Sequence, residues 1–125
     1  MTIGIKGEAR DIVNENNTAA TMKSGELRVY ATPAMIALME QAAYKSIADE
    51  LKDGQGSVGT LMNVQHIAAT PVGMQVRAES ELFAVEGRKL TFRVEAFDER
   101  GKIGEGIHER FLVDNQKFQQ KADTK

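Results

Sequence analysis

Residues 32–53 read TPAMIALMEQAAYKSIADELKD, and they form the only long helical pattern in the chain. Thr32 and Pro33 fit a helix start, because a hydroxyl can accept from a free N–H and proline needs no N–H donor there. On a 3.6-residue wheel, one side is mainly apolar and carries Ile36, Glu40, Ala43, Ile47 and Leu51. The opposite side is polar and carries Gln41, Lys45, Asp49 and Lys52. We expect a helix from Thr32 to about Asp53, with Thr32 as its N-cap.

Glu40 stands out because the wheel places it in the middle of the apolar stripe. Charged side chains are almost never fully buried unless they are paired, since desolvation disfavours the ionised form. We expect Glu40 to be buried and to have either a partner or a chemical role.

Four segments with strand character follow the helix. They are separated by turns at residues 71–73, 86–88 and 98–101. Short connections predict an antiparallel meander. The first strand, residues 57–69, should put His66 on its more apolar face with Val58, Thr60, Met62, Val64 and Ala68. In the last strand, residues 102–113, Gly104 and Gly106 indicate a bulge or a close approach of backbones.

The rest of the chain adds little regular structure. One more strand is expected near residues 3–13, followed by a loop over 14–25, and the polar tail 114–125 is expected to fray. One helix packed on an antiparallel sheet is an α+β architecture. In this arrangement Glu40 and His66 both point into the interface between the helix and the sheet.

Composition bounds the class of protein. A chain of 125 residues and 13.7 kDa fits one domain, 1–125, with a core of its own. A net charge of -2 with mixed signs does not favour nucleic acid, and no apolar run approaches the roughly 18 residues of a membrane span. There is no cysteine, and the N-terminus lacks the apolar core of a secretory signal. We expect a cytoplasmic protein that acts on a small molecule, without a metal or a separate cofactor.

The chain resembles the fluoroacetyl-CoA thioesterase family. The resemblance covers about residues 29–113 and is carried by VYATPAMIALME (29–40), GSVGT (56–60), VQHIAATP (64–71), VEGR (85–88) and IGEGIHER (103–110). It implies the hot-dog fold, acyl-CoA as substrate and a homodimer formed by joining two sheets. By resemblance, the catalytic residues of the family are matched by Thr32, Glu40 and His66. We call these three residues the trio. Gly59 and Arg110 match substrate-binding positions, without a specific role for Arg110.

The chemistry of the trio is plausible without the resemblance. Imidazole, with a pKa near 6.5, can act as a general base at neutral pH, which makes His66 the candidate base. Glu40 could stabilise the imidazolium or attack the acyl carbon itself. Thr32 could donate a hydrogen bond or act as a nucleophile, and the helix start and the Gly59 N–H could stabilise an oxyanion. Each residue also has a structural interpretation: an N-cap, a partly exposed or subunit-facing carboxylate, and a core histidine.

Two further motifs do not carry function in this interpretation. Residues 54–59 spell G-x-G-x-x-G, but they follow a helix and precede a strand, the reverse of the dinucleotide fingerprint. His108 and Glu109 have no recognised metal-ligand spacing, so we interpret them, with Arg110, as a charged cluster on a strand surface.

Differences from the family bear on the substrate. Residues 22–28, MKSGELR, are short and polar where the fluoroacetyl-specific member has a longer segment rich in aromatics. We therefore expect a short or medium acyl-CoA and no fluoroacetyl selectivity. The alternative function is a hot-dog protein that binds an acyl-CoA or a small acid without hydrolysing it.

Overall fold

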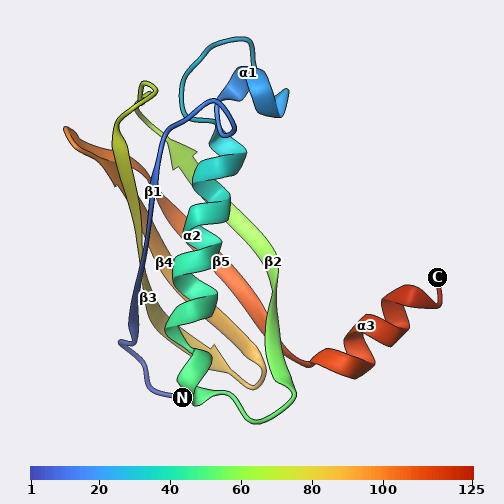
Figure 1. Ribbon diagram of the computed structural model, residues 1–125. Helices are drawn as coiled ribbons and strands as arrows, with labels where there is room; N and C mark the ends of the chain where they lie inside the picture. The colour runs from blue at the N-terminus through green and yellow to red at the C-terminus, as the bar shows by residue number, and fades with distance from the viewer.

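The computed structural model describes residues 1–125 and contains one long helix embraced by a curled sheet (Figure 1). The elements, in chain order, are β1 (Lys6–Ile12), α1 (Ala19–Met22), α2 (Thr32–Ser46), the 3₁₀ turn η1 (Ala48–Glu50), β2 (Gln55–His66), β3 (Gln75–Glu86), β4 (Lys89–Asp98), β5 (Gly101–Asp114) and α3 (Asn115–Asp123). The α+β architecture with a central helix and an antiparallel sheet is confirmed.

The sheet has five strands in the order β1-β3-β4-β5-β2, all antiparallel. β3, β4 and β5 form the expected meander. β2 does not pair with the next strand in the chain: residues 67–74 carry the chain across the fold, and β2 pairs with β5 instead. The strand predicted near residues 3–13 is confirmed as β1, and it pairs with β3. β1 and β2 are therefore the two open edges of the sheet.

Helix α2 is shorter than the sequence pattern predicts. Its N-cap is Ala31, so Thr32 is the first helical residue and not the cap. The α-helix ends at Ser46, and the predicted extension to Asp53 is wrong. Residues 49–53 include three acids, Asp49, Glu50 and Asp53, and negative charge at a helix C-terminus is opposed by the helix dipole. Ile47 and Leu51 keep the helical spacing of apolar residues, but both lie after the end of the α-helix.

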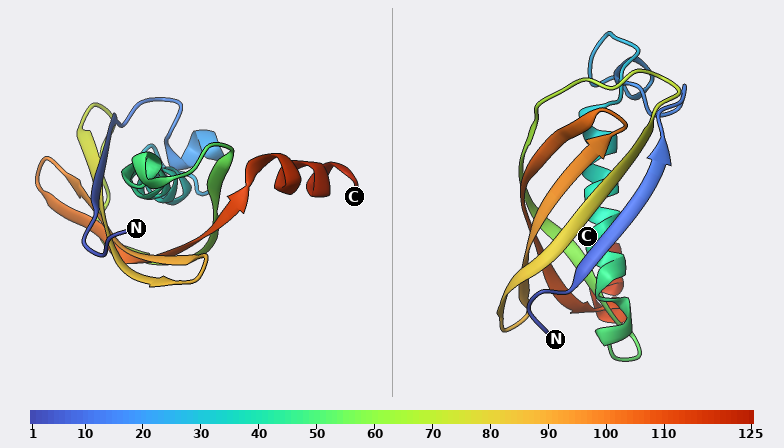
Figure 2. Two further views of the ribbon diagram at one scale, coloured as in Figure 1. Left: turned by 90° about the horizontal axis from the view of Figure 1, so that it is seen from below. Right: turned by 90° about the vertical axis from the view of Figure 1, so that its left-hand side faces the viewer.

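The end-on view shows α2 against the concave face of the sheet (Figure 2), and the core lies between the two. The residues that α2 buries are Met35, Leu38, Met39, Ala42 and Ala43. Sheet residues that complete this core include Ala78, Leu82, Leu90, Phe92, Val94 and Ala96. The buried stripe is thus rotated from the predicted one, and Ile36 and Glu40 lie at its border rather than at its centre.

A bulge in β2 changes which side chains face the helix. The register with β5 pairs Gly59 with Arg110 and Leu61 with Glu109, so Thr60 is the extra residue. Beyond the bulge Met62, Val64 and His66 face inward as expected, whereas before it the inward positions are Ser57 and Gly59. The prediction that Val58 and Thr60 face inward is therefore wrong.

Two short helices lie in regions where no helix was predicted. α1 lies in the region predicted as a loop. In place of a frayed tail, α3 covers residues 115–123, capped by the Asp114 carboxylate, which accepts from the Lys117 N–H. α3 buries none of its residues and projects away from the body of the molecule (Figures 1 and 2). No helix has the length and apolar character needed to cross a membrane.

Candidate active site

A hydroxyl and an imidazole meet where α2 begins and β2 ends. Thr32 Oγ1 lies 2.8 Å from His66 Nδ1, a hydrogen-bond distance. Tyr30 packs edge-on against His66, with ring centroids 6.5 Å apart. The other ring nitrogen, Nε2, is buried without a hydrogen-bond partner. The structure therefore brings together two members of the predicted trio.

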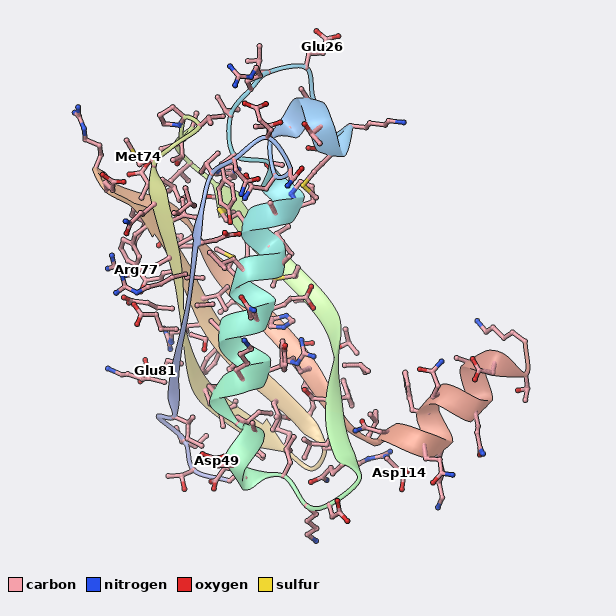
Figure 3. The ribbon with its side chains drawn as sticks, in the orientation of Figure 1. Glu26, Asp49, Met74, Arg77, Glu81 and Asp114 are labelled. Carbon is pink, nitrogen blue, oxygen red and sulfur yellow. The ribbon has the colours of Figure 1, made fainter.

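This pair borders a pocket of about 280 Å³. Most of its lining is apolar, and the residues are Ala19, Ser24, Val29, Tyr30, Thr32, His66, Ile67, Ala68 and Ala69. Glu26 lies in the loop at the same end of the molecule (Figure 3). The pocket thus offers a small apolar space beside one hydroxyl and one imidazole.

Burial affects the imidazole. Desolvation lowers the pKa of His66 from its ordinary value of 6.5, because the charged form is disfavoured away from water, while a backbone contact to Ala68 acts the other way. The neutral ring, which can accept a proton, therefore predominates at neutral pH.

Glu40 lies in a second polar group further along α2. Its Oε2 is 3.3 Å from Arg110 Nη1, and 40% of the Glu40 side chain remains exposed. The expectation of a partnered carboxylate is correct, but the partner is Arg110 rather than His66, and the carboxylate is not fully buried. Arg110 comes from β5 and is only 6% exposed.

Arg110 is held from three sides. Its Nε donates to Ser57 Oγ at 2.9 Å and its Nη2 donates to the Ser57 carbonyl oxygen at 3.0 Å. Its Nη1 lies 3.1 Å from His108 Nε2, and its guanidinium lies over the Tyr44 ring. Desolvation lowers the pKa of Arg110, and the Glu40 carboxylate opposes that shift.

His108 and Arg110 face the interior, which corrects the surface cluster expected for residues 108–110. His108 is fully buried. Only Glu109 points outward, toward Lys89 at 3.8 Å. The two-residue spacing of His108 and Arg110 on one strand was the available signal that they share a face. Gly104 and Gly106 interrupt the alternation of apolar and polar residues, so the sequence did not indicate whether this face is buried.

Gly59 fits closely against this second group. A Cβ added there would lie 3.2 Å from His108 Cε1 and 3.3 Å from Arg110 Nη1, and it would overlap Glu40 Oε2. Only a residue without a side chain lets the carboxylate occupy this space. The structure thus brings together three of the five residues predicted for the site, Glu40, Gly59 and Arg110, and adds Ser57 and His108, which the sequence analysis did not assign.

The two groups do not meet within one chain. Thr32 and Glu40 are eight residues apart on α2, which corresponds to about 12 Å along the helix axis. His66 contacts Thr32, and no hydrogen bond or ion pair joins His66 to Glu40. A single chain therefore presents two half-sites, one at the start of α2 and one at its middle.

A curled five-stranded antiparallel sheet around one long helix is the hot-dog fold of thioesterases. The model of the fluoroacetyl-CoA-specific thioesterase family matches residues 13–116. The chain belongs to this family, whose members are thioester hydrolases.

Individual relatives agree with this assignment. The fluoroacetyl-CoA thioesterase of Streptantibioticus cattleyicolor is 45% identical over 97 residues, covering 78% of this chain and 70% of that protein. A solved structure of the fluoroacetyl-CoA thioesterase FlK superposes with a TM-score of 0.94 at 37% identity, covering 100% of this chain and 97% of the other. A threonine-to-serine variant of FlK in complex with acetyl-CoA superposes with a TM-score of 0.94 at 35% identity, covering 99% and 98%.

Proposed function

We propose that the chain is an acyl-CoA thioesterase that hydrolyses a short or medium acyl thioester with Thr32, His66 and Glu40. The observation that carries the proposal is the contact of 2.8 Å between Thr32 Oγ1 and His66 Nδ1 at the edge of a small, mostly apolar pocket. Membership in a thioesterase family and the acetyl-CoA complex of a relative support the choice of substrate class.

In the proposed reaction His66 acts as the general base through Nδ1, since Nε2 is buried away from water. Nδ1 takes the proton of the Thr32 hydroxyl, 2.8 Å away, as Thr32 Oγ1 bonds to the acyl carbon. When the C–S bond breaks, the imidazolium gives this proton to the sulfur of coenzyme A, which leaves free coenzyme A and an acyl ester of Thr32. Nδ1 then takes a proton from water as the water oxygen bonds to the acyl carbon, and it returns this proton to Thr32 Oγ1 as the ester breaks, which leaves a carboxylic acid and the free hydroxyl.

Glu40 takes part in this site as Glu40 of the partner subunit in a homodimer. Within one chain Glu40 lies too far along α2 to reach His66, but its side chain is 40% exposed beside the open edge of β2. Edge strands present unpaired backbone groups that a second chain can pair. A negative charge supplied across this edge would stabilise the imidazolium that forms during the reaction.

The register of β2 indicates which pairing would join the half-sites. Any two-fold antiparallel pair centred on a residue of β2 sets inward residues opposite inward residues, and among these we propose the pair centred on Asn63. Val64 then faces Met62 of the partner subunit. Because Thr60 is an extra residue in the bulge, His66 faces Gly59 of the partner subunit, the residue packed against Glu40. This pairing joins the two half-sites twice per dimer, with Gly59 and Arg110 serving to seat the carboxylate.

The pocket walls bear on the choice of acyl group. A volume of about 280 Å³ suits a small acyl chain, and Ala19 and Ser24 give it a compact, partly polar wall. The segment 22–28 brings Glu26 and other polar residues to this end of the molecule rather than aromatic ones. We therefore propose that the enzyme accepts short or medium acyl groups without selecting fluoroacetyl-CoA.

The test is release of free coenzyme A from a panel of acyl-CoAs that includes acetyl-CoA and fluoroacetyl-CoA. The parent chain should turn over at least one short or medium thioester, and Glu40→Gln and His66→Ala should each lower kcat about 100-fold or more. Tight binding of acyl-CoAs without turnover would instead establish a binding protein. Activity that survives both substitutions would show that the assigned site is wrong.

A further inference from the structure

We propose that His108 is a positioning residue. It holds both Arg110 and the bulge of β2, and thereby fixes the positions of Glu40 and Gly59 that hydrolysis requires. His108 is fully buried and forms no part of the trio. The inference rests on the proposed function, because the role it assigns is to position Glu40 for thioester hydrolysis.

The two hydrogen bonds of the ring define one protonation state. Nδ1 lies 2.9 Å from the carbonyl oxygen of Leu61, which can only accept, so Nδ1 must carry a proton. Nε2 lies 3.1 Å from Arg110 Nη1, and a guanidinium can only donate, so Nε2 must be unprotonated. His108 is therefore a neutral ring with its proton on Nδ1.

One of these bonds secures the bulge. Leu61 is the residue where the β2–β5 register resumes after the extra residue, Thr60. On the other flank Thr60 Oγ1 donates to the Glu109 carbonyl oxygen at 3.3 Å. The bulge turns Gly59 toward Glu40, so the bond from His108 to Leu61 helps to fix how closely the Gly59 backbone approaches the carboxylate.

The other bond secures Arg110. The guanidinium donates from the same Nη1 to His108 and to Glu40, so the position of the imidazole sets where this nitrogen meets the carboxylate. The ring itself stacks on Phe92, with centroids 6.1 Å apart and planes 28° apart. The charged or titratable groups that face His108 and Arg110 are Glu40 and Tyr44, both from α2.

Variants of His108 separate positioning from packing. His108→Phe keeps a ring that can stack on Phe92 but removes both hydrogen bonds. His108→Gln places an amide oxygen near the position of Nε2, where it can accept from Arg110, and His108→Asn places an amide donor near the position of Nδ1, where it can donate to Leu61. Glu105→Gln, on the exposed side of the same strand, is the control and should match the parent.

We expect His108→Phe to lower kcat about 10- to 100-fold with KM changed less than about threefold, since small displacements of reacting groups have effects of this size. His108→Gln and His108→Asn should each recover part of the loss. A folded His108→Phe variant with the kcat of the parent would overturn the proposal. So would equal losses in all three variants, because a purely packing role predicts no rescue by hydrogen-bonding side chains.

A second measurement is independent of catalysis and of the folding of any variant. Long-range ¹H–¹⁵N correlation spectra of the parent should show His108 neutral, with its proton on Nδ1, throughout the range from pH 6 to pH 8. A proton on Nε2, or a charged ring in that range, would refute the inference even if no thioester is hydrolysed. Absence of hydrolysis together with the expected spectrum would overturn the proposed function alone.

Discussion

Glu40 and Gly59 are fitted to each other at the scale of single atoms. The carboxylate occupies the space that a side chain at position 59 would need, and it bonds Arg110 from there at 3.3 Å. Glu40, at the border of the apolar stripe, is thereby held by the Arg110 guanidinium and by the backbone at Gly59. This arrangement explains how Glu40 can remain 40% exposed and still have a fixed position.

Replacement of Gly59 by alanine tests this fit. We expect Gly59→Ala to displace the Glu40 carboxylate, to lower kcat at least about tenfold, and to reduce the free energy of unfolding by about 1–3 kcal/mol through overpacking. Chemical denaturation and steady-state kinetics measure the two effects. The control for stability is Gly25→Ala, whose added Cβ would meet only Ala19 Cβ at 3.4 Å and should not reduce the free energy of unfolding. An active, fully stable Gly59→Ala variant would contradict the observed packing.

The pH dependence of hydrolysis follows from the surroundings of His66. Desolvation lowers the pKa of His66, whereas the carboxylate of Glu40 of the partner subunit would raise it by stabilising the imidazolium. The value of kcat/KM should therefore fall on the acid side with a slope of one in a logarithmic plot, and Glu40→Gln should move this fall to lower pH. An acid limb at the same pH in the parent and in Glu40→Gln would contradict the contact between Glu40 and His66.

The sequence indicated which residues belong to the site better than it indicated which residues contact each other there. Thr32 and His66 were expected near each other and they are, because the end of β2 does lie against the start of α2. The ion pair of Glu40 with Arg110 was not expected. Arg110 is 70 positions away in the chain, and its direction depends on strand parity, which the wheel for α2 does not contain.

At the scale of elements, two glycines of β5 leave no room for a side chain. A Cβ added at Gly106 would meet backbone atoms of Asn63 and Val64, the latter at 2.6 Å, whereas one at Gly104 would meet mainly the flexible end of Met35. Gly106 pairs with Val64 and Gly104 pairs with His66 without a register shift. Both expectations for this strand are confirmed: the backbones approach closely at Gly106, and the pairing of β5 with β4 has a bulge beside Gly104, where Ile103 is the extra residue.

Alanine variants of Gly106 and Gly104 test whether the neighbouring backbone or side chain can move to make room for a Cβ. Gly106→Ala should lower the free energy of unfolding by about 1–3 kcal/mol, because backbone cannot move aside without parting β2 from β5. Gly104→Ala should cost less, since the Met35 side chain can adopt another rotamer. Urea denaturation of both variants gives the comparison. A larger loss for Gly104→Ala would contradict the explanation from backbone contact.

Element boundaries were predictable only where local chemistry determines them. The turns at 86–88 and 98–101 separate β3, β4 and β5 as expected, because glycine with positive φ stands in both, at Gly87 and Gly101. The end of α2, predicted at about Asp53, and the place of β2 in the meander were predicted wrongly. The end of α2 depends on charge at the helix terminus. The pairing of β2 depends on which strand still has an open edge after the chain has crossed the fold.

At the scale of the whole molecule, the open edge of β2 is the feature on which the proposed dimer depends. A two-fold pair centred on Asn63 sets this residue opposite its own copy. Asn63→Asp would therefore place two like charges face to face, which weakens a strand pair by up to about 1 kcal/mol and raises the dimer dissociation constant about fivefold. Sedimentation velocity over a dilution series measures the change.

The control for this substitution is Asn16→Asp, the same chemical change in an exposed segment away from β2. It should leave the dissociation constant unaltered. A parent protein that sediments at 13.7 kDa at all concentrations would contradict the dimer itself. An Asn63→Asp variant that dimerises as tightly as the parent would contradict its centre.

The most direct test of the central claim, that each active site joins Thr32 and His66 of one chain to Glu40 of the other, is recovery of activity on mixing two inactive variants. Equal amounts of Glu40→Gln and His66→Ala are unfolded together, refolded and assayed for release of coenzyme A. Random pairing makes about half of the dimers mixed, each with one intact site of two, so the mixture should regain about a quarter of the parent activity. Activity no higher than that of the separate variants would contradict the shared site.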